Sequence, residues 1–342
     1  MKDTTLEAVT EKKVYNEPEK DIKISVTLPS RGKTFGFSKN TNRIVSYIIF
    51  ENSFHGFKFQ ELYKERKLQI SSTCRKYGLG KFPKDLESEE DESSAYQKMG
   101  DSFPWPPEKS LMYQEPWHLL YCWIHKVASS SWSKVFFNLK GKEVPTTRLH
   151  EAAQQFSIPS SKLPAAISNS LVFTIVRHPF ERLVSAYRDK FELAKKYAYV
   201  YTMYASKILG LKTPTEAERV RRPTFSEFVD YLLRVPVQQF NDHWVPYWLH
   251  CHVCEMEYDI IGKMETIADD MEFIAERSGL AATNISLPWT NRRNSGDKVS
   301  LDYFRHLTVD QVMGLYRIYK LDFEMFGYRV GPYFQQLSET VP

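Results

Sequence analysis

The residues from Leu119 to Leu139, LLYCWIHKVASSSWSKVFFNL, constrain the fold of this chain more than any other stretch. They begin with a short apolar and aromatic run over 119–124, which suits a buried strand. A small, polar segment with one cation follows, and the apolar side chains of 132–139 then recur with helical spacing. A strand, a small-residue turn and a helix predict an anion-binding loop, because the N–H groups and the dipole of a helix start attract negative charge.

The chemistry of this loop rests on one cation and three hydroxyl groups: Lys126 precedes Ser129, Ser130 and Ser131. The glycine-rich nucleotide-binding pattern GxxxxGK[ST] is absent, since here the cation comes before the hydroxyls. That order argues against an ordinary ATP or GTP hydrolase. A serine-rich start of a core helix is the alternative interpretation of the same residues.

A second strand–turn–helix pattern runs from Leu171 to Phe191, LVFTIVRHPFERLVSAYRDKF. Its β-branched, apolar start predicts a buried parallel strand, and Pro179 fits the first position of the helix that follows. Arg177 then lies at the carboxyl end of a strand, where open α/β sheets bind their ligands. Ser185 lies six residues into the helix, on a turn that can face the same crevice. A core helix with scattered arginines is the alternative.

A third stretch, 241–274, is rich in residue types that bind metals. Within twelve positions it holds His243, His250, Cys251, His252 and Cys254. The two cysteines have the spacing of a zinc ribbon, but no second pair of this kind follows, and Cys74 and Cys122 are distant in sequence. Zinc is therefore disfavoured. The run YDIIGKM predicts a strand, and a helix is expected from Glu265 onward.

Bulk properties limit the class of protein. With 342 residues and 42% hydrophobic side chains, the chain can form one large α/β domain or two small ones. Its net charge of +4 suits an anionic ligand or a polyanionic glycan, and no nucleic-acid partner is expected. Four cysteines are too few for a disulfide scaffold. No run approaches the roughly 20 apolar residues of a membrane span, and no signal peptide is visible, so these features alone predict a soluble, cytosolic protein.

Three motifs, taken in order, resemble those of the membrane-bound carbohydrate sulfotransferases of the chondroitin 4-O and HNK-1 type. The Lys-Val-Gly-Cys-Thr-Asn-Trp-like loop of that family corresponds to KVASSSW at 126–132, with small residues at each departure. Its Arg-Asp-Pro-Phe-x-Arg-Leu-x-Ser-Ala-Tyr-Arg-x-Lys-Phe signature corresponds to 177–191, where His178 replaces the acidic residue. Its Asp-x-His-Trp-x-Pro…Cys-x-x-Cys…Tyr-Asp-x-Ile-Gly-Lys-x-Glu-Thr run is matched within 242–266.

The resemblance implies a P-loop-like, three-layer α/β fold with a central parallel sheet flanked by helices. This domain would occupy 111–335 and follow a polar, partly disordered, stem-like lead over 1–110. The donor would be 3′-phosphoadenosine 5′-phosphosulfate, whose 3′-phosphate Arg177 and Ser185 would hold, and no metal is required because the protein supplies the cations. The residues that match the donor-binding motifs are Lys126, Val127, Ala128, Ser129, Ser130, Ser131, Trp132, Arg177 and Ser185.

In the implied reaction, Lys126 stabilises the leaving phosphate oxygen, and a second group removes the proton of the acceptor hydroxyl. We assign this general base to His243, because its motif is hard to justify by packing alone. Glu265 and His150 are second choices. A buried core histidine is the alternative interpretation of His243.

The resemblance also implies an acceptor and a compartment. The acceptor would be an anionic glycan or glycoprotein, chondroitin- or dermatan-like, with the sugar and hydroxyl left open. The enzyme would be a type II membrane protein of the Golgi lumen, contacting the membrane only through an anchor that this chain does not display. There, Cys251 and Cys254 would form a disulfide, either with each other or with another cysteine. The N-glycosylation sequon at 284–286 would also lie in a compartment where glycosylation takes place.

Two other classes of function stay open at this stage. A nucleotide or sugar kinase of the P-loop type is disfavoured by the missing GK[ST] and by the lack of an acidic Mg²⁺ ligand near the loop. A catalytically silent glycan- or nucleotide-binding protein on the same fold is compatible with the substitutions in the loop and with His178.

Overall fold

The computed structural model describes residues 24–28, 33–37, 54–82, 90–103, 107–283 and 297–338, and the sequon at 284–286 lies outside them. The chain divides into two compact units, Met1–Asn42 and Arg43–Pro342. In the first unit, β1 (Ile24–Leu28) pairs antiparallel with β2 (Lys33–Phe37). All of the motifs described above lie in the second unit.

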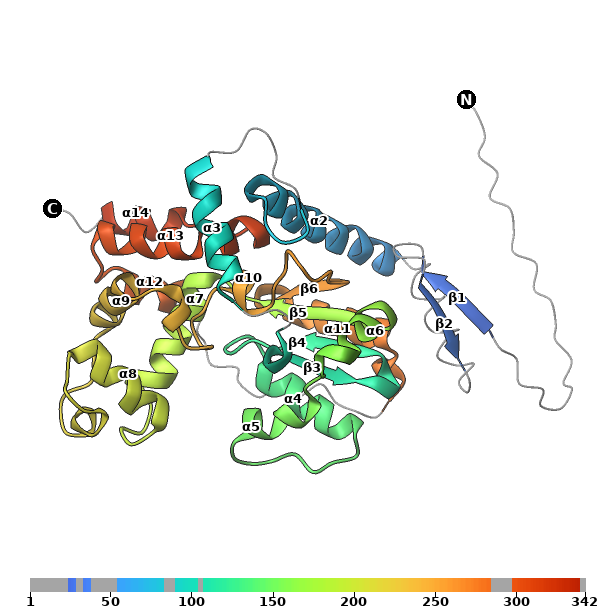
Figure 1. Cartoon of the computed structure of the whole chain (residues 1–342), viewed down its shortest axis with the longest axis horizontal. Coiled ribbons are helices and arrows are strands. Elements are labelled where there is room, and N and C mark those ends of the chain that lie inside the picture. Colours follow the sequence, from blue (N-terminus) through green and yellow to red (C-terminus); the bar gives the residue numbers. More distant parts are fainter. Residues whose placement is uncertain are drawn as a thin grey trace, which may run out of the picture. The chain divides into compact units, whose positions relative to one another are not determined.

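The second unit is built on a four-stranded sheet of order β3-β4-β5-β6 (Figure 1). The strands are β3 (Leu111–Gln114), β4 (Leu119–Cys122), β5 (Leu171–Val176) and β6 (Ile260–Lys263). β4, β5 and β6 are parallel, as predicted, whereas the edge strand β3 is antiparallel to β4. Only four residues, 115–118, connect β3 to β4. Such a connection is long enough to reverse the chain but too short for the crossover that a parallel pair requires.

Helices cover both faces of this sheet, which gives the expected layered α/β architecture (Figure 1). The helices are α2 (Phe54–Tyr77), α3 (Glu90–Asp101), α4 (Ser129–Leu139), α5 (Leu149–Ala153), α6 (Leu163–Asn169), α7 (Pro179–Tyr187), α8 (Tyr199–Leu209), α9 (Phe225–Arg234), α10 (Tyr247–His250), α11 (Ile267–Ser278), α12 (Asp297–Phe304), α13 (Val309–Phe326) and α14 (Gly331–Ser338). In Figure 1, α4 and α5 are seen beyond the β3 side of the sheet, and α2 is seen beyond the β6 side. The central strand β5 is buried along nearly its whole length, because it is covered on both faces.

Local sequence signals set several of these boundaries. Thr224 and Glu227, in the sequence pattern Thr-x-x-Glu, form a capping box at the start of α9, with both reciprocal hydrogen bonds present. α7 is followed by a single π-helical turn, η5 (Arg188–Glu192), which carries the chain from the second motif towards α8.

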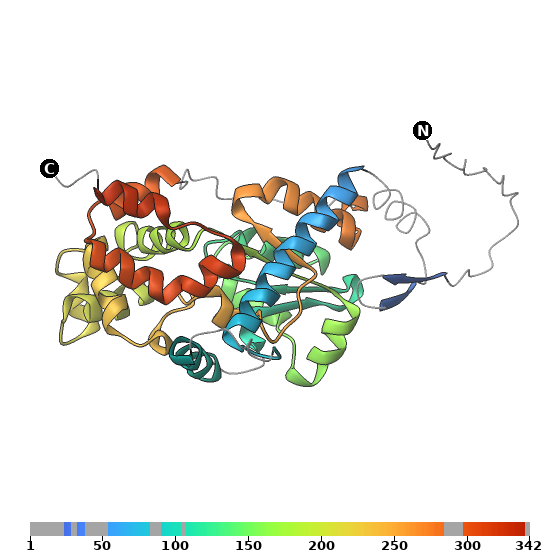
Figure 2. The same cartoon turned by 90° about the horizontal axis from the view of Figure 1, so that it is seen from above.

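α2 belongs to the second compact unit and precedes the domain at 111–335 that the resemblance implies. Its Tyr63 hydroxyl donates to the buried Asp270, and Arg66 Nη1 lies 2.9 Å from Asp270 Oδ1 and 2.6 Å from the Ile261 carbonyl oxygen. The side chain of Arg66 is therefore largely buried, and it ties α2 to β6 and α11. Figure 2 shows α2 lying across the sheet region. Its role could not be read from the sequence because its buried partner lies 204 positions further along.

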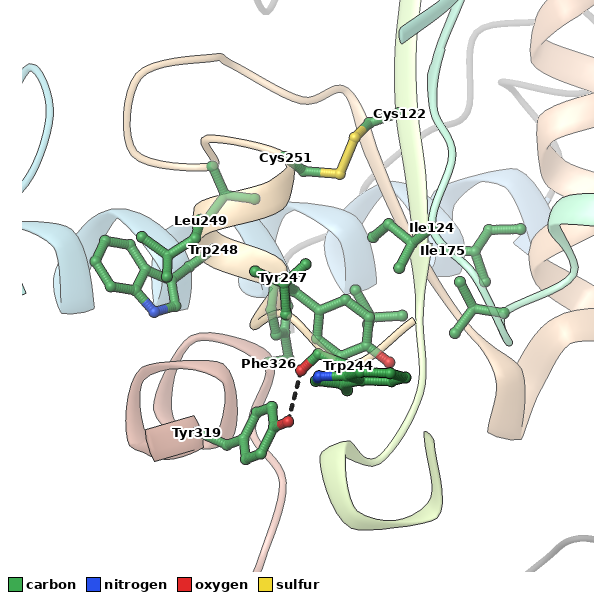
Figure 3. Close-up of a cluster of buried hydrophobic side chains, with 14 of the residues drawn as sticks. Cys122, Ile124, Ile175, Trp244, Tyr247, Trp248, Leu249, Cys251, Tyr319 and Phe326 are labelled. Atoms are coloured by element: carbon green, nitrogen blue, oxygen red, sulfur yellow. Dashed lines mark hydrogen bonds between the residues drawn. A yellow bond between two sulfur atoms is a disulfide. The ribbon is translucent and has the colours of Figure 1, made fainter. Parts of the chain in front are cut away.

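Two disulfides tie distant parts of the chain together. Cys74 of α2 is bonded to Cys254, and Cys122 at the end of β4 is bonded to Cys251 (Figure 3). The prediction that the CxxC cysteines form disulfides is confirmed, and each uses a distant partner. Within the part of the chain that the structure describes, no helix combines the length and apolar character needed to cross a membrane.

Candidate active site

The first strand–loop–helix unit leads from β4 through residues 123–128 into α4. Lys126 and Ala128 both have a positive φ, 73° and 62°, which is costly for residues other than glycine and is typical of functional sites. Ala128 is the N-cap of α4 but makes no side-chain capping hydrogen bond. The first four N–H groups of an α-helix have no partner within the helix, so this helix start is suited to holding an anion.

The three serines at the start of α4 lie in different surroundings. All three belong to the first turn of α4, and Ser129 and Ser131 are buried. Ser130 is half-buried, and its Oγ lies 3.3 Å from His150 Nε2. The hydroxyl of Ser130 therefore contacts a titratable group.

Two other residues of the predicted donor loop are core residues. The side chains of Val127 and Trp132 are fully buried, and the ring of Trp132 packs against Phe173 of β5 with centroids 4.6 Å apart. Only the main-chain atoms of Val127 and Trp132 are therefore available to a ligand. The predicted role of these two residues in donor binding is limited to those atoms.

The second strand–loop–helix unit leads from β5 into α7 and begins with Arg177. Arg177 Nε and Nη2 lie 3.0 and 2.8 Å from Glu181 Oε2, one helical turn further on. The exposed fractions of the two side chains are only 8% and 7%, so this is a buried ion pair. The Tyr247 hydroxyl, 3.1 Å away, accepts from the Arg177 N–H and also donates to its carbonyl oxygen. The guanidinium of Arg177 is therefore held in one place by its own helix.

His178 occupies the position where the sulfotransferase signature has an acidic residue, and it caps α7. Its Nδ1 accepts a hydrogen bond from the Phe180 N–H at 3.3 Å. Because Nδ1 accepts, the proton lies on Nε2, which donates to the Arg329 carbonyl oxygen at 3.1 Å. Asp is a preferred capping residue at such a helix start. The replacement by histidine therefore preserves the helix cap.

Glu265, a second choice for the general base, is held by two donors. Its Oε1 accepts from the main-chain N–H of His178 at 2.9 Å, and its Oε2 accepts from the Tyr328 hydroxyl at 3.0 Å. The first bond joins the end of β6 to the start of α7, and the second joins it to the chain just after α13. Glu265 thus has a structural role that its position in the motif did not reveal.

The two units meet at one edge of the sheet. β4 and β5 are neighbours, and Cys122 pairs with Thr174 in a parallel register, so both loops leave the sheet at its carboxyl edge. The prediction that Lys126 and Arg177 follow neighbouring parallel strands is confirmed. Ser185 lies further along α7 and is half-buried.

A carboxylate stands between two cations in this region. Lys126 Nζ lies 3.3 Å and Lys190 Nζ 3.1 Å from the same oxygen, Asp189 Oδ2. Burial lowers the pKa of Lys126, Asp189 opposes that shift, and Lys190 and Arg177 add to it. Burial alone would raise the pKa of Asp189, but Lys126 and Lys190 bring it below its ordinary value. The side chain of Asp189 is 42% exposed, so an incoming anion can compete with it for Lys126.

Three histidine rings lie beside this charged group. His125 and His243 are stacked, with ring centroids 3.7 Å apart and an interplanar angle of 7°, and the centroid of His150 lies 4.8 Å from that of His125. Burial lowers the pKa of His243 well below its ordinary value, and His125, Lys190 and Lys126 lower it further. The pKa of His125 is also lowered well below its ordinary value, first by burial. Both rings are therefore neutral near pH 7.

The tautomer of His243 is set by Asn241. Asn241 Oδ1 accepts a hydrogen bond from the main-chain N–H of His243 at 3.1 Å. The same oxygen lies within hydrogen-bond distance of His243 Nδ1, so Nδ1 must carry the proton. His243 Nε2 is then the unprotonated nitrogen, which is the form able to accept a proton.

Sequence reasoning missed three residues of this site: His125, Asp189 and Asn241. His125 directly precedes Lys126, and Asp189 lies inside the matched signature. Their places in the two motifs could therefore have marked both residues as candidates for the site. Nothing in the sequence indicates that the ring of His125 stacks on that of His243. Within the described part of the chain, no group of three or more His, Cys, Asp or Glu residues is arranged to hold a metal ion.

The comparisons with known proteins identify sulfotransferases. The model described as the sulfotransferase family matches residues 109–329. Mouse carbohydrate sulfotransferase 11 is 30% identical over 295 residues, which cover 80% of this chain and 82% of that protein. Carbohydrate sulfotransferase 12 of Xenopus laevis is 27% identical over 298 residues, covering 78% and 68%, and carbohydrate sulfotransferase 14 of Danio rerio is 30% identical over 231 residues, covering 64% and 62%. No solved structure matches the chain.

Proposed function

The chain belongs to the sulfotransferase family, and we propose that it transfers a sulfuryl group from 3′-phosphoadenosine 5′-phosphosulfate to a hydroxyl group of a glycan. The observation that carries this proposal is the meeting, at one sheet edge, of an uncapped helix start with Lys126 and a base-competent His243. The names of its relatives support a carbohydrate acceptor.

In the proposed complex, the donor spans the two strand–loop–helix units. The N–H groups at the start of α4, the serine hydroxyls and Lys126 bind the 5′-phosphosulfate. Arg177 and Ser185, on the second unit, bind the 3′-phosphate. Because Glu181 already fixes the guanidinium of Arg177, this group is preorganised for the phosphate and loses little freedom on binding. The cations belong to the protein, so the proposed chemistry needs no metal.

The proposed reaction is a single displacement at sulfur. The acceptor hydroxyl oxygen forms a bond to sulfur while the bond from sulfur to the bridging phosphate oxygen breaks. The hydroxyl proton moves to His243 Nε2, and the electron pair of the broken bond leaves with adenosine 3′,5′-bisphosphate. Lys126 stabilises the charge that develops on the bridging oxygen, which is where electrostatic stabilisation has its largest effect.

The lowered pKa of His243 fits a general base that must be neutral before reaction. Lys126 and Lys190 contribute to that lowering. A bound donor brings negative charges next to these cations, which raises the pKa of His243 as the reaction requires. The base therefore becomes stronger when the donor is in place.

We propose a chondroitin- or dermatan-like chain, free or on a glycoprotein, as the acceptor, and the Golgi lumen as the compartment. Two disulfides between distant cysteines support an oxidising compartment. Any membrane association would come from an anchor outside the features described here.

The test is transfer of labelled sulfate from the donor to a panel of desulfated glycosaminoglycans. We expect transfer to a chondroitin- or dermatan-type acceptor by the wild type. His243→Gln should bind the donor normally and lose transfer, whereas the exposed His306→Gln should behave as the wild type. If His243→Gln keeps near-normal turnover, His243 is a structural residue and His150 or Glu265 becomes the base to test. Donor binding without transfer to any acceptor would instead indicate a catalytically silent protein.

The pH dependence tests the role of Asn241. Because the pKa of His243 is lowered in the donor-free protein, the acid limb of kcat/KM for the donor, which reports the free enzyme, should lie below pH 6.5, the ordinary histidine value. Asn241→Asp places a negative charge beside the ring, favours the imidazolium and should move this limb to higher pH. An unchanged acid limb in Asn241→Asp would show that His243 is not the group that titrates.

A further inference from the structure

The segment that follows η5 exposes several large side chains close together. Among the described residues, six large apolar or aromatic side chains are exposed, and three of them lie within seven positions: Leu193, Tyr197 and Tyr199, with exposed fractions of 55%, 68% and 75%. Lys195 and Lys207 of the same segment are also exposed. We call these five residues the α8 platform.

The cations of the α8 platform lie over aromatic rings. Lys195 Nζ is 5.7 Å from the ring centroid of Tyr197, and Lys207 Nζ is 5.1 Å from that of the half-buried Tyr204. A flat ring next to an ammonium group offers an apolar face and a positive charge at the same place.

The surrounding segment is strongly positive. Residues 193–222 hold seven basic and two acidic side chains, a net charge of +5, whereas the whole chain carries +4. Three of the basic residues fasten the segment: Lys196 donates to the Val220 carbonyl oxygen, Arg221 pairs with Glu227, and Arg222 donates to the Ala194 carbonyl oxygen. The field of the remaining cations acts on the exposed face, where it attracts a polyanion.

Tyr204 connects the α8 platform to the candidate active site. Its side chain hydrogen bonds to Asn241, the residue that fixes the tautomer of His243. Its ring also packs edge-on against Trp244, with centroids 4.9 Å apart. At the other end, Leu193 follows Asp189 and Lys190, which flank Lys126, by only a few residues. The segment that carries the platform is therefore linked through Tyr204 to the loop of the base, and through the chain from Asp189 to Leu193 to the cation.

We propose that the α8 platform is the docking surface for an acidic polysaccharide, whose next sugar units extend from it towards His243. This inference rests on the proposed function. The apolar faces of pyranose rings pack on Tyr197 and Tyr199, and uronate carboxylates pair with Lys195 and Lys207.

A polysaccharide fits this surface better than an anionic membrane. Its two most exposed rings carry hydroxyl groups, which hydrogen bond to sugars, and Leu193 is the one aliphatic side chain in the platform. The hydrogen bond between Tyr204 and Asn241 also links the segment of the platform to a site that must receive a sugar hydroxyl.

The test measures binding of the full chain to desulfated chondroitin by calorimetry. Tyr197→Ser/Tyr199→Ser should raise the Kd about tenfold, or about 1.4 kcal/mol. Lys195→Gln/Lys207→Gln should have a similar effect at low ionic strength that shrinks as salt is added. Leu68→Ser, which removes a side chain with the same 55% exposure from α2, is the matched control and should change nothing.

Kinetics separate docking from chemistry. The platform variants should raise KM for the polymer by the same factor as the Kd, while kcat/KM for a disaccharide acceptor and the Kd of the donor stay at the wild-type values. The proposal is overturned if the wild type does not bind the polymer, or if the tyrosine variant binds it as tightly as Leu68→Ser. It is also overturned if the variant loses binding to phosphatidylserine vesicles but keeps its affinity for chondroitin. A wild type that binds polymer and donor but transfers no sulfate would contradict the proposed function and leave the docking surface standing.

Discussion

The two strand–loop–helix units lie next to each other at one sheet edge, but they hold their cations in different ways. In the first unit, the backbone of Lys126 has a positive φ. The side chain of Lys126 is 21% exposed, and that of its partner Asp189 is 42% exposed. In the second, Arg177 is buried and is bound by Glu181 of its own helix.

The difference between the two units indicates that Lys126 and Arg177 have different roles. A cation whose partner is exposed can exchange that partner for a ligand or a developing charge. A cation in a buried pair keeps its position, whatever the state of the reaction, and its loss removes the opposite charge from a buried carboxylate. We infer that Lys126 serves the transition state and that Arg177 positions the donor, and four substitutions test this comparison.

The largest effect is expected from Arg177→Ala, and it should fall on stability. The substitution leaves the Glu181 carboxylate buried without its cation, which typically costs about 3–5 kcal/mol of unfolding free energy. Urea denaturation measures the loss. Arg177→Lys, which keeps the charge but not the fork of donors, should restore most of the stability while the donor Kd stays raised. A stable Arg177→Ala protein would contradict the buried-pair description.

Lys126→Ala should instead spare the fold and slow the reaction. Its ion pair with Asp189 is partly exposed, so the unfolding free energy should change by less than about 1 kcal/mol. Turnover should fall roughly 30- to 1000-fold, or about 2–4 kcal/mol, because the lost contact acts where charge develops. The exposed Lys162→Ala serves as a control in the same transfer assay. A change in donor Kd with unchanged kcat would reverse the roles assigned to the two cations.

The helix starts offer a third contrast, because α7 has a side-chain cap and α4 has none. His178→Ala should lower the unfolding free energy by about 1 kcal/mol, since the Phe180 N–H loses its acceptor. His178→Asp should retain the cap and with it the stability of α7. Equal losses in both variants would assign the stability to the contact of His178 with Arg329 instead.

The smallest effect should come from Ala128→Gly, and it should be a gain. Ala128 has a φ of 62°, which glycine adopts without steric cost, so the free energy of unfolding should rise by up to about 1 kcal/mol. Ala186→Gly, in the regular part of α7, should have the opposite sign, because glycine weakens an ordinary helix. If both variants lose stability, the loop of the first unit stores no strain.

The sequence by itself determined the local elements and their order. The strand predicted from LVFTIV is β5, the helix predicted after the serines is α4, and the capping box at Thr224 starts α9. These signals are local, because periodicity, β-branched runs and helix caps involve residues only a few positions apart. Because parallel strands share one carboxyl edge, the sequence also placed Lys126 and Arg177 together.

Only the tertiary structure decided which distant groups became partners. Cys122 and Cys251 are 129 positions apart, Cys74 and Cys254 are 180 apart, and no spacing rule pairs them. The stack of His125 on His243, and the placement of α2 within the folded unit, also depend on contacts between remote segments. Such contacts follow from how the helices pack on the sheet, and many different packings are compatible with the same local pattern, so the chemistry of His243 was settled by its neighbours in space.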